Sequence, residues 1–181
     1  MILVVPREIS RRLRAELRRA RRVEIGGLLF GEQLSDDTFR IADFTVQRTG
    51  GTRAHFVRDP EQHASQLASF FDYSGRDYTR FNYLGEWHSH PSCTPAPSAI
   101  DMIEMSRLIT DPGVGASFVV LLIVRLRLFG RLAATASLFV RDRGPTPVEL
   151  IWAHHGSSRP TRREENRNVE ASQRARIVRN A

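Results

Sequence analysis

The sequence predicts an α/β (α+β) domain in which a mixed, mainly antiparallel sheet is flanked by helices. The chain has 181 residues, a usual length for one domain, and 41% of them are hydrophobic, enough for a substantial core. Apolar segments of strand length alternate with segments of helical periodicity. Their order is a short strand, a helix, several strands, a helix, a strand, a third helix and further strands, which favours one layered domain.

The N-terminal elements are a strand and a basic amphipathic helix. Residues 2–5 are apolar, and Pro6 fits the first turn of a helix that we expect to reach Arg22. Its apolar positions recur at four-residue spacing: Ile9, Leu13 and Leu17. This stripe under a coat of arginines favours a packed helix over a nucleic-acid-binding arm.

The middle of the chain is expected to form strands and a second helix. In the strand over 24–31, Gly26 and Gly27 leave room for the close approach of a metal site or a substrate backbone. His63 falls in the first turn of the helix, where we expect a surface residue. The further expected elements are a turn at 33–37, a strand over 36–47, a turn at 49–52, a strand over 54–57, and a helix capped by Asp59 that runs from Pro60 to Tyr73.

The C-terminal part is expected to contain a third helix and three strands. The helix follows Asp101, ends at the Asp111-Pro112-Gly113 stop signal, and buries Met102, Ile103, Met105, Leu108 and Ile109. The strands cover 117–128, 131–140 and 148–152, with a turn at Gly130. Residues 157–181 are rich in Arg, Glu, Ser and Asn, so we expect a mobile or marginally helical tail. The predicted division is a domain over 1–155 and a basic, polar tail over 156–181.

The stretch from Gly85 to Asp101 indicates a metal site. Alternation along a strand points His88 and His90 to the same face. Prolines 91, 95 and 97 then force a turn, and the helix that opens at Ser98 can bring Asp101 back towards the histidines. Two histidines and one carboxylate, with a fourth position left for water, are the ligands of a catalytic zinc site.

Each fragment has a simpler explanation. His-x-His occurs by chance, and Ser-x-x-Asp before an apolar run is also the pattern of a helix cap. The joint spacing is more specific, and it resembles the JAMM signature of the JAB1/MPN/Mov34 metalloproteases. Glu24 before paired glycines matches the upstream glutamate of that family. The resemblance covers roughly residues 2–153, and Tyr83 to Pro91 is most similar to the bacterial JAB branch.

The resemblance implies the three-layer MPN/JAB (cytidine-deaminase-like) fold and a Zn²⁺ cofactor. His88, His90 and Asp101 would bind the metal, Glu24 would act as general acid and base, and Ser98 would donate a hydrogen bond to the oxyanion. The implied reaction is zinc-dependent hydrolysis of an isopeptide or peptide bond at the C-terminus of a ubiquitin-like protein, for deconjugation or precursor maturation. Enzymes of this branch are associated with E1-like and E2-like operon partners, including those of antiviral operons. An extended substrate tail is expected to pair with a strand edge beside Gly26 and Gly27.

Two more residues near the motif have open roles. Glu86 lies two residues before His88, so it either orients that ligand or forms a surface salt bridge. Cys93 lies in the loop between the ligands, where it is a free thiol or an inhibitory, redox-sensitive zinc ligand.

Charge and cysteine content indicate the possible partners and the cellular compartment. All 27 basic residues are arginines, and eight of them lie in residues 1–22 and seven in 157–181. These ends either are solvated or contact nucleic acid, an acidic partner or an anionic surface. A single cysteine excludes an internal disulfide, and no signal pattern or long apolar span is present. We therefore expect a cytoplasmic protein without a membrane partner.

Two other classes of function fit part of the pattern. One is a catalytically silent MPN scaffold, which the five intact motif positions disfavour. The other is a RadC-like, DNA-associated protein, which shares a similar His-x-His-Pro segment. Glu86 and Trp87 before the first histidine, together with Glu24 before the glycine pair, favour the protease.

Overall fold

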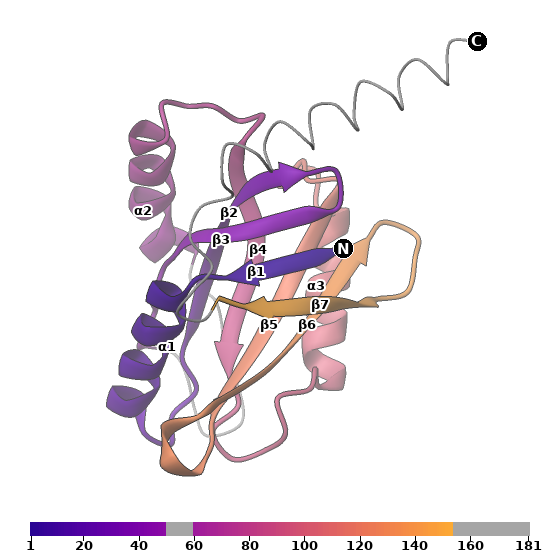
Figure 1. The fold of residues 1–181 in the computed structure, drawn as a ribbon. Helices are drawn as coiled ribbons and strands as arrows, with labels where there is room; N and C mark the ends of the chain where they lie inside the picture. The colour runs from indigo at the N-terminus through magenta and orange to yellow at the C-terminus, as the bar shows by residue number, and fades with distance from the viewer. Residues whose placement is uncertain (50–59, 154–181) are drawn as a thin grey trace, which may run out of the picture.

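The protein is described here by a computed structural model that covers residues 1–49 and 60–153 (Figure 1). The expected turn over 49–52, the strand over 54–57, the Asp59 cap and the tail after 155 lie wholly or mainly outside these residues. The helices and strands, in chain order, are β1 (Ile2–Val5), α1 (Arg7–Ala20), β2 (Gly26–Ser35), β3 (Thr38–Phe44), α2 (Pro60–Tyr73), β4 (Phe81–Ser89), α3 (Ala99–Thr110), β5 (Phe118–Leu126), a 3₁₀ turn (Leu128–Gly130), β6 (Leu132–Val140) and β7 (Thr146–Trp152).

The described strands form a closed barrel in the order β1-β3-β2-β4-β5-β6-β7. β1 is parallel to both β3 and β7, and β4 is parallel to β5, whereas the other neighbours are antiparallel. The mixed sheet is thus confirmed, but the expectation of a sheet that is simply flanked by helices is incomplete. Ile2 pairs with Thr38 on one side and with Glu149 on the other, so the two ends of the sheet meet.

The helices cover the two faces of the curved sheet. Leu13 and Leu17 of α1 belong to the main buried cluster, together with Leu29, Trp87 and Leu122 from the strands. On the other face, α3 packs over β5 and β6, and α2 packs over β2 and β4. Figure 1 shows α1 and α3 on opposite sides of the strands. The three layers that the family resemblance implied are therefore present, although the middle layer is closed.

The bounds of one strand and the exposure of two side chains differ from the expectation. β2 begins at Gly26 and continues to Ser35, because pairing with β3 extends it through polar residues that do not look like a strand. Ile103 is 53% exposed on α3 instead of facing inward, whereas Met105 is buried as expected. His63 is only 2% exposed, so its assignment to the surface is wrong.

A β-bulge at Gly85 determines which way the metal-site strand faces. The β2–β4 register shifts there, and Leu84 and Trp87 both point into the main cluster although they are three residues apart. Gly85 has φ +141°, and an added Cβ would lie 2.0 Å from the carbonyl oxygen of Val120, so this position requires glycine. Trp87 is fully buried, as predicted. The bulge thereby places His88 on the opposite face, towards α3.

No helix within residues 1–49 and 60–153 combines the length and apolar composition needed to cross a membrane.

Candidate metal centre

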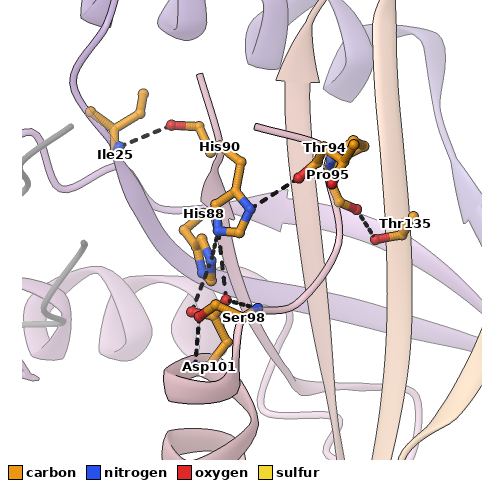
Figure 2. Close-up of polar contacts among 9 residues, drawn as sticks. Ile25, His88, His90, Thr94, Pro95, Ser98, Asp101 and Thr135 are labelled. Carbon is orange, nitrogen blue, oxygen red and sulfur yellow. Dashed lines mark hydrogen bonds and ion pairs between the residues drawn. The ribbon is translucent and has the colours of Figure 1, made fainter. Parts of the chain in front are cut away.

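Three side chains converge where β4 ends and α3 begins (Figure 2). Nε2 of His88 lies 3.1 Å from Nε2 of His90. The carboxylate of Asp101 is close to both rings, with 3.3 Å from Oδ1 to His88 Nε2 and 3.6 Å from Oδ2 to His90 Nε2. These three residues form a group that can hold a metal ion.

The spacing of these atoms fits zinc. Ligand atoms about 2.1 Å from a tetrahedral zinc are about 3.4 Å from one another. The observed separations of 3.1–3.6 Å bracket this value. Two imidazole nitrogens and one carboxylate oxygen also have the chemistry of a catalytic zinc site, in which three protein ligands leave a position for water. His88, His90 and Asp101 therefore fit the ion that the family implies.

A helix cap holds Asp101 in place. Ser98 is the N-cap of α3, and its Oγ accepts a hydrogen bond from the backbone N–H of Asp101 at 3.2 Å. In return, the backbone N–H of Ser98 donates to Oδ2 of Asp101 at 2.6 Å. The alternative assignment of Ser-x-x-Asp to a cap is thus confirmed, but the cap also turns the carboxylate towards the histidines. One carboxylate serves both the cap and the ligand group.

Asp101 is held in its ionised form. Burial alone would raise the pKa of its carboxyl group, but the hydrogen bond and charge of His88 and the hydrogen bonds with Ser98 lower that pKa well below its usual range. The N-terminus of a helix also favours a negative charge. Asp101 therefore offers an anionic oxygen at neutral pH.

The tautomer of His90 follows from its second ring nitrogen. Nδ1 lies 3.3 Å from the carbonyl oxygen of Thr94, which can only accept a hydrogen bond. We therefore assign the proton of the neutral ring to Nδ1, which leaves a lone pair on Nε2, the atom that faces His88 and Asp101.

The cap does not prevent Ser98 from acting as an oxyanion donor. Its Oγ accepts from the Asp101 N–H, whereas oxyanion stabilisation needs the hydroxyl hydrogen, which the cap does not use. The residue is exposed at the rim of the metal group. The two roles proposed for Ser98 are therefore compatible.

Glu24 is 3% exposed and lies two residues before β2, so the expectation that the strand begins at residue 24 is wrong. Ser89 Oγ accepts a hydrogen bond from the Ile25 N–H at 3.0 Å, and the Ser89 N–H donates to the Ile25 carbonyl at 2.8 Å. Continuing this antiparallel register places the backbone of Glu24 opposite His90. Glu24 is thus a buried carboxylate at the level of the metal ligands.

The glycine pair has a different purpose from the expected one. A Cβ on Gly27 would lie 2.4 Å from the carbonyl oxygen of Thr45, so the close neighbour is the chain's own backbone. Gly26 exchanges backbone hydrogen bonds with Gln47 on one side and is paired with His88 on the other. No strand edge remains at Gly26 and Gly27, and the expectation that a substrate tail pairs there is wrong.

Glu86 and Cys93 are not part of the metal group. Glu86 is half-buried on β4, opposite Leu28 and Leu121, on the same side of the strand as His88. Cys93 is exposed in the loop, and among the described residues it is not one of those that can hold a metal.

A buried polar network supports the strand beside the site. His63 Nδ1 lies 2.7 Å from Thr45 Oγ1, and its Nε2 lies 3.1 Å from Gln47 Oε1. Trp87 Nε1 donates to the Thr45 carbonyl at 2.8 Å. No pattern in the sequence indicates this network, because His63 and Thr45 come from separate segments without a shared motif.

Comparisons with known proteins identify the family of the chain. A family model described as prokaryotic homologs of the JAB domain matches residues 6–137. A CD-NTase/cGAS isopeptidase from Enterobacter hormaechei subsp. hoffmannii (strain UCI 50) is 30% identical over 135 residues, which cover 70% of this chain and 68% of that protein.

Solved structures show the same fold. A protein from Desulfitobacterium hafniense, determined in solution, has 25% identity and a TM-score of 0.61, with coverage of 85% of this chain and 94% of that one. A Salinibacter ruber protein has 22% identity and a TM-score of 0.51, with coverage of 88% and 95%. The family model, which matches most of the chain, and the 30% identical relative show that the chain belongs to the prokaryotic JAB family.

Proposed function

We propose that this protein is a zinc-dependent isopeptidase or peptidase that cleaves after the C-terminus of a ubiquitin-like protein. The observation that carries the proposal is the convergence of His88, His90 and Asp101 within 3.1–3.6 Å. The E. hormaechei relative is named an isopeptidase, which supports the class of bond. The proposal includes the E1-like and E2-like operon partners that the family resemblance implied.

The residues of this chain divide the work of hydrolysis. A zinc ion in this site would supply a Lewis acid that lowers the pKa of a water and polarises the scissile carbonyl. Glu24 accepts a proton from the attacking water and delivers it to the leaving amine. Ser98 donates a hydrogen bond from its hydroxyl group to the carbonyl oxygen as negative charge develops there. Thr94 keeps His90 in the tautomer whose Nε2 can bind the metal.

The name of the relative also suggests which conjugate to test first. That relative is called a CD-NTase/cGAS isopeptidase. A ubiquitin-like protein joined through an isopeptide bond to a CD-NTase is therefore the first candidate substrate. A linear fusion of the same ubiquitin-like protein to a reporter tests precursor maturation, because it presents a peptide bond after the same tail.

The experiment is a cleavage assay on both substrates with zinc, with a chelator and with Glu24→Gln. We expect zinc-dependent cleavage at the C-terminal junction, with loss of turnover but retention of zinc in Glu24→Gln. Glu104→Gln is the matched control, because Glu104 is exposed on α3 outside the metal group. A protein that binds zinc and leaves both substrates intact would contradict the proposal.

The same samples separate the two alternative functions. A scaffold would bind its partners without cleaving them, even with zinc bound. A RadC-like protein would bind DNA with an affinity that falls steeply as salt concentration rises, and it would not cleave the conjugate.

A further inference from the structure

The loop between His90 and Ser98 is held by its backbone carbonyl groups. Three consecutive carbonyl oxygens each meet a different side chain. Arg125 donates from its terminal NH1 nitrogen to the carbonyl of Cys93 at 2.8 Å, and Thr135 Oγ1 donates to the carbonyl of Pro95. The carbonyl between them, that of Thr94, faces Nδ1 of His90 at 3.3 Å. Figure 2 shows the Thr94 and Pro95 contacts side by side.

The two outer donors come from one place in the sheet. Arg125 lies on β5 and Thr135 on β6, and Thr135 is paired with Ile123, two residues before Arg125. Residues two apart on a strand share a face, so Arg125 and Thr135 are diagonal neighbours. Ile123 packs in the cluster under α3, which places both donors on the metal side of the sheet.

Within the loop, the Ala96 N–H donates a hydrogen bond to the Thr94 carbonyl at 2.8 Å, but little else anchors the loop to the rest of the domain. As the structure describes them, residues 91–97 contribute nothing to the three buried clusters, and Ser92, Cys93, Thr94 and Ala96 are exposed. The contact made by Arg125 also has a desolvation cost, because its Nε is buried without a hydrogen-bond partner among the described residues. The polar contacts from β5 and β6 are therefore the main restraints on the position of the loop.

We propose that Arg125 and Thr135 are positioning residues for the metal centre. They fix the carbonyls on either side of Thr94, so the Thr94 oxygen stays where the Nδ1–H of His90 donates to it. His90 Nε2 then remains aimed at His88 Nε2 and Asp101. Loss of either restraint lets the Thr94 carbonyl turn away, and the His90 ring loses its preferred tautomer and orientation. This inference rests on the metal site of the proposed function, not on its substrate.

The test uses Arg125→Gln and Thr135→Val, with Thr135→Ser as the conservative rescue, because serine keeps the donor. Arg127→Gln is the control: Arg127 is an exposed arginine on the same stretch, and the structure gives its side chain no contact with the loop. The first readout is the affinity and visible absorption of bound Co²⁺, a spectroscopic substitute for zinc. We expect affinity to fall about 10–100-fold in Arg125→Gln and Thr135→Val, as for other partners of metal ligands, and to stay near wild type in the other two.

The second readout does not need a metal. The ¹⁵N–¹H correlations of the His90 ring in metal-free protein at mildly alkaline pH report its tautomer. We expect the Nδ1–H form in the wild type and a mixture in Arg125→Gln and Thr135→Val. Wild-type tautomer and Co²⁺ affinity in both variants would overturn the proposal. Failure of the proposed function is distinct, because it would appear as metal-bound wild type that cleaves no conjugate.

Discussion

Two buried acids at opposite ends of the β2–β4 pair have opposite surroundings. Glu32 lies opposite Phe81 at the start of β4, whereas the His88 end of β4 lies opposite Gly26 and meets Asp101. The Glu32 side chain is 3% exposed, and the half-buried Asp101 side chain is 13% exposed. Burial alone therefore does not distinguish a structural carboxylate from a candidate ligand.

The difference lies in what each carboxylate meets. Arg80 donates to one oxygen of Glu32 at 2.6 and 2.9 Å, and Arg40 donates to the other. Two permanent cations thus saturate Glu32. Asp101 instead faces two imidazole nitrogens, a group type that commonly binds metal ions. A carboxylate whose two oxygens are both paired with arginines needs no further cation. A carboxylate that faces two histidines can bind a metal ion together with them.

The largest expected effect is at Asp101. Asp101→Ala removes one proposed metal ligand and half of the helix cap, so we expect no stoichiometric zinc and no measurable cleavage. Metal analysis of purified protein, with cleavage of the conjugate, checks both. Glu32→Ala is the matched control at the other end and should retain zinc. Wild-type zinc affinity in Asp101→Ala would show that Asp101, like Glu32, does not bind the metal.

Ser98 gives the next largest effect. Ser98→Ala should lower kcat roughly 10²–10³-fold, because one oxyanion donor is lost. It should also lower the free energy of unfolding by about 1 kcal/mol through loss of the cap. Ser98→Gly separates the two, since glycine at an N-cap costs only a few tenths of a kcal/mol. If Ser98→Gly cleaves as fast as wild type, the hydroxyl has no catalytic role.

Removal of Glu32 should affect stability without affecting the metal. Arg40 and Arg80 are 44% and 58% exposed, so they regain hydration when the acid is lost, and we expect Glu32→Ala to cost about 1–3 kcal/mol. Denaturant unfolding measures this loss. Zinc at 100 times its Kd should add about 2.7 kcal/mol to wild type and variant alike. A variant that zinc no longer stabilises would mean that the two ends are coupled.

The smallest effect is expected at Cys93. Its side chain is exposed and is outside the metal group, so Cys93→Ser should leave zinc affinity and cleavage unchanged under reducing conditions. Zinc titration and cleavage rates check this. Faster cleavage by Cys93→Ser than by wild type would instead support the inhibitory-ligand hypothesis.

Prediction from the sequence succeeded for the proximity of residues that are close along the chain. His88, His90 and Asp101 are close in sequence, so strand alternation and a proline-rich turn are enough to bring them together. Ser98 and Asp101 form a cap within one helical turn. Features that depend on distant segments were missed, including the Arg125 and Thr135 contacts to the ligand loop.

The closure of the sheet and the role of the glycine pair were missed for the same reason. β1 and β7 pair although they lie at opposite ends of the domain's sequence, and no local pattern predicts that pairing. Gly27 was correctly expected to mark a close approach, but the approaching group is Thr45. Sequence shows that space is needed at a glycine, whereas only the fold shows what occupies it.

The meeting of β1 with β7 also constrains biosynthesis. Ile2 is synthesised before its partner Glu149, which follows about 7–30 s later at translation rates of roughly 5–20 residues per second. One side of β1 can pair early with β3, but the other side stays an unpaired strand edge until the last strand has been made. The nascent chain is therefore most exposed to aggregation during that interval, and the sheet closes only after β7 has been made.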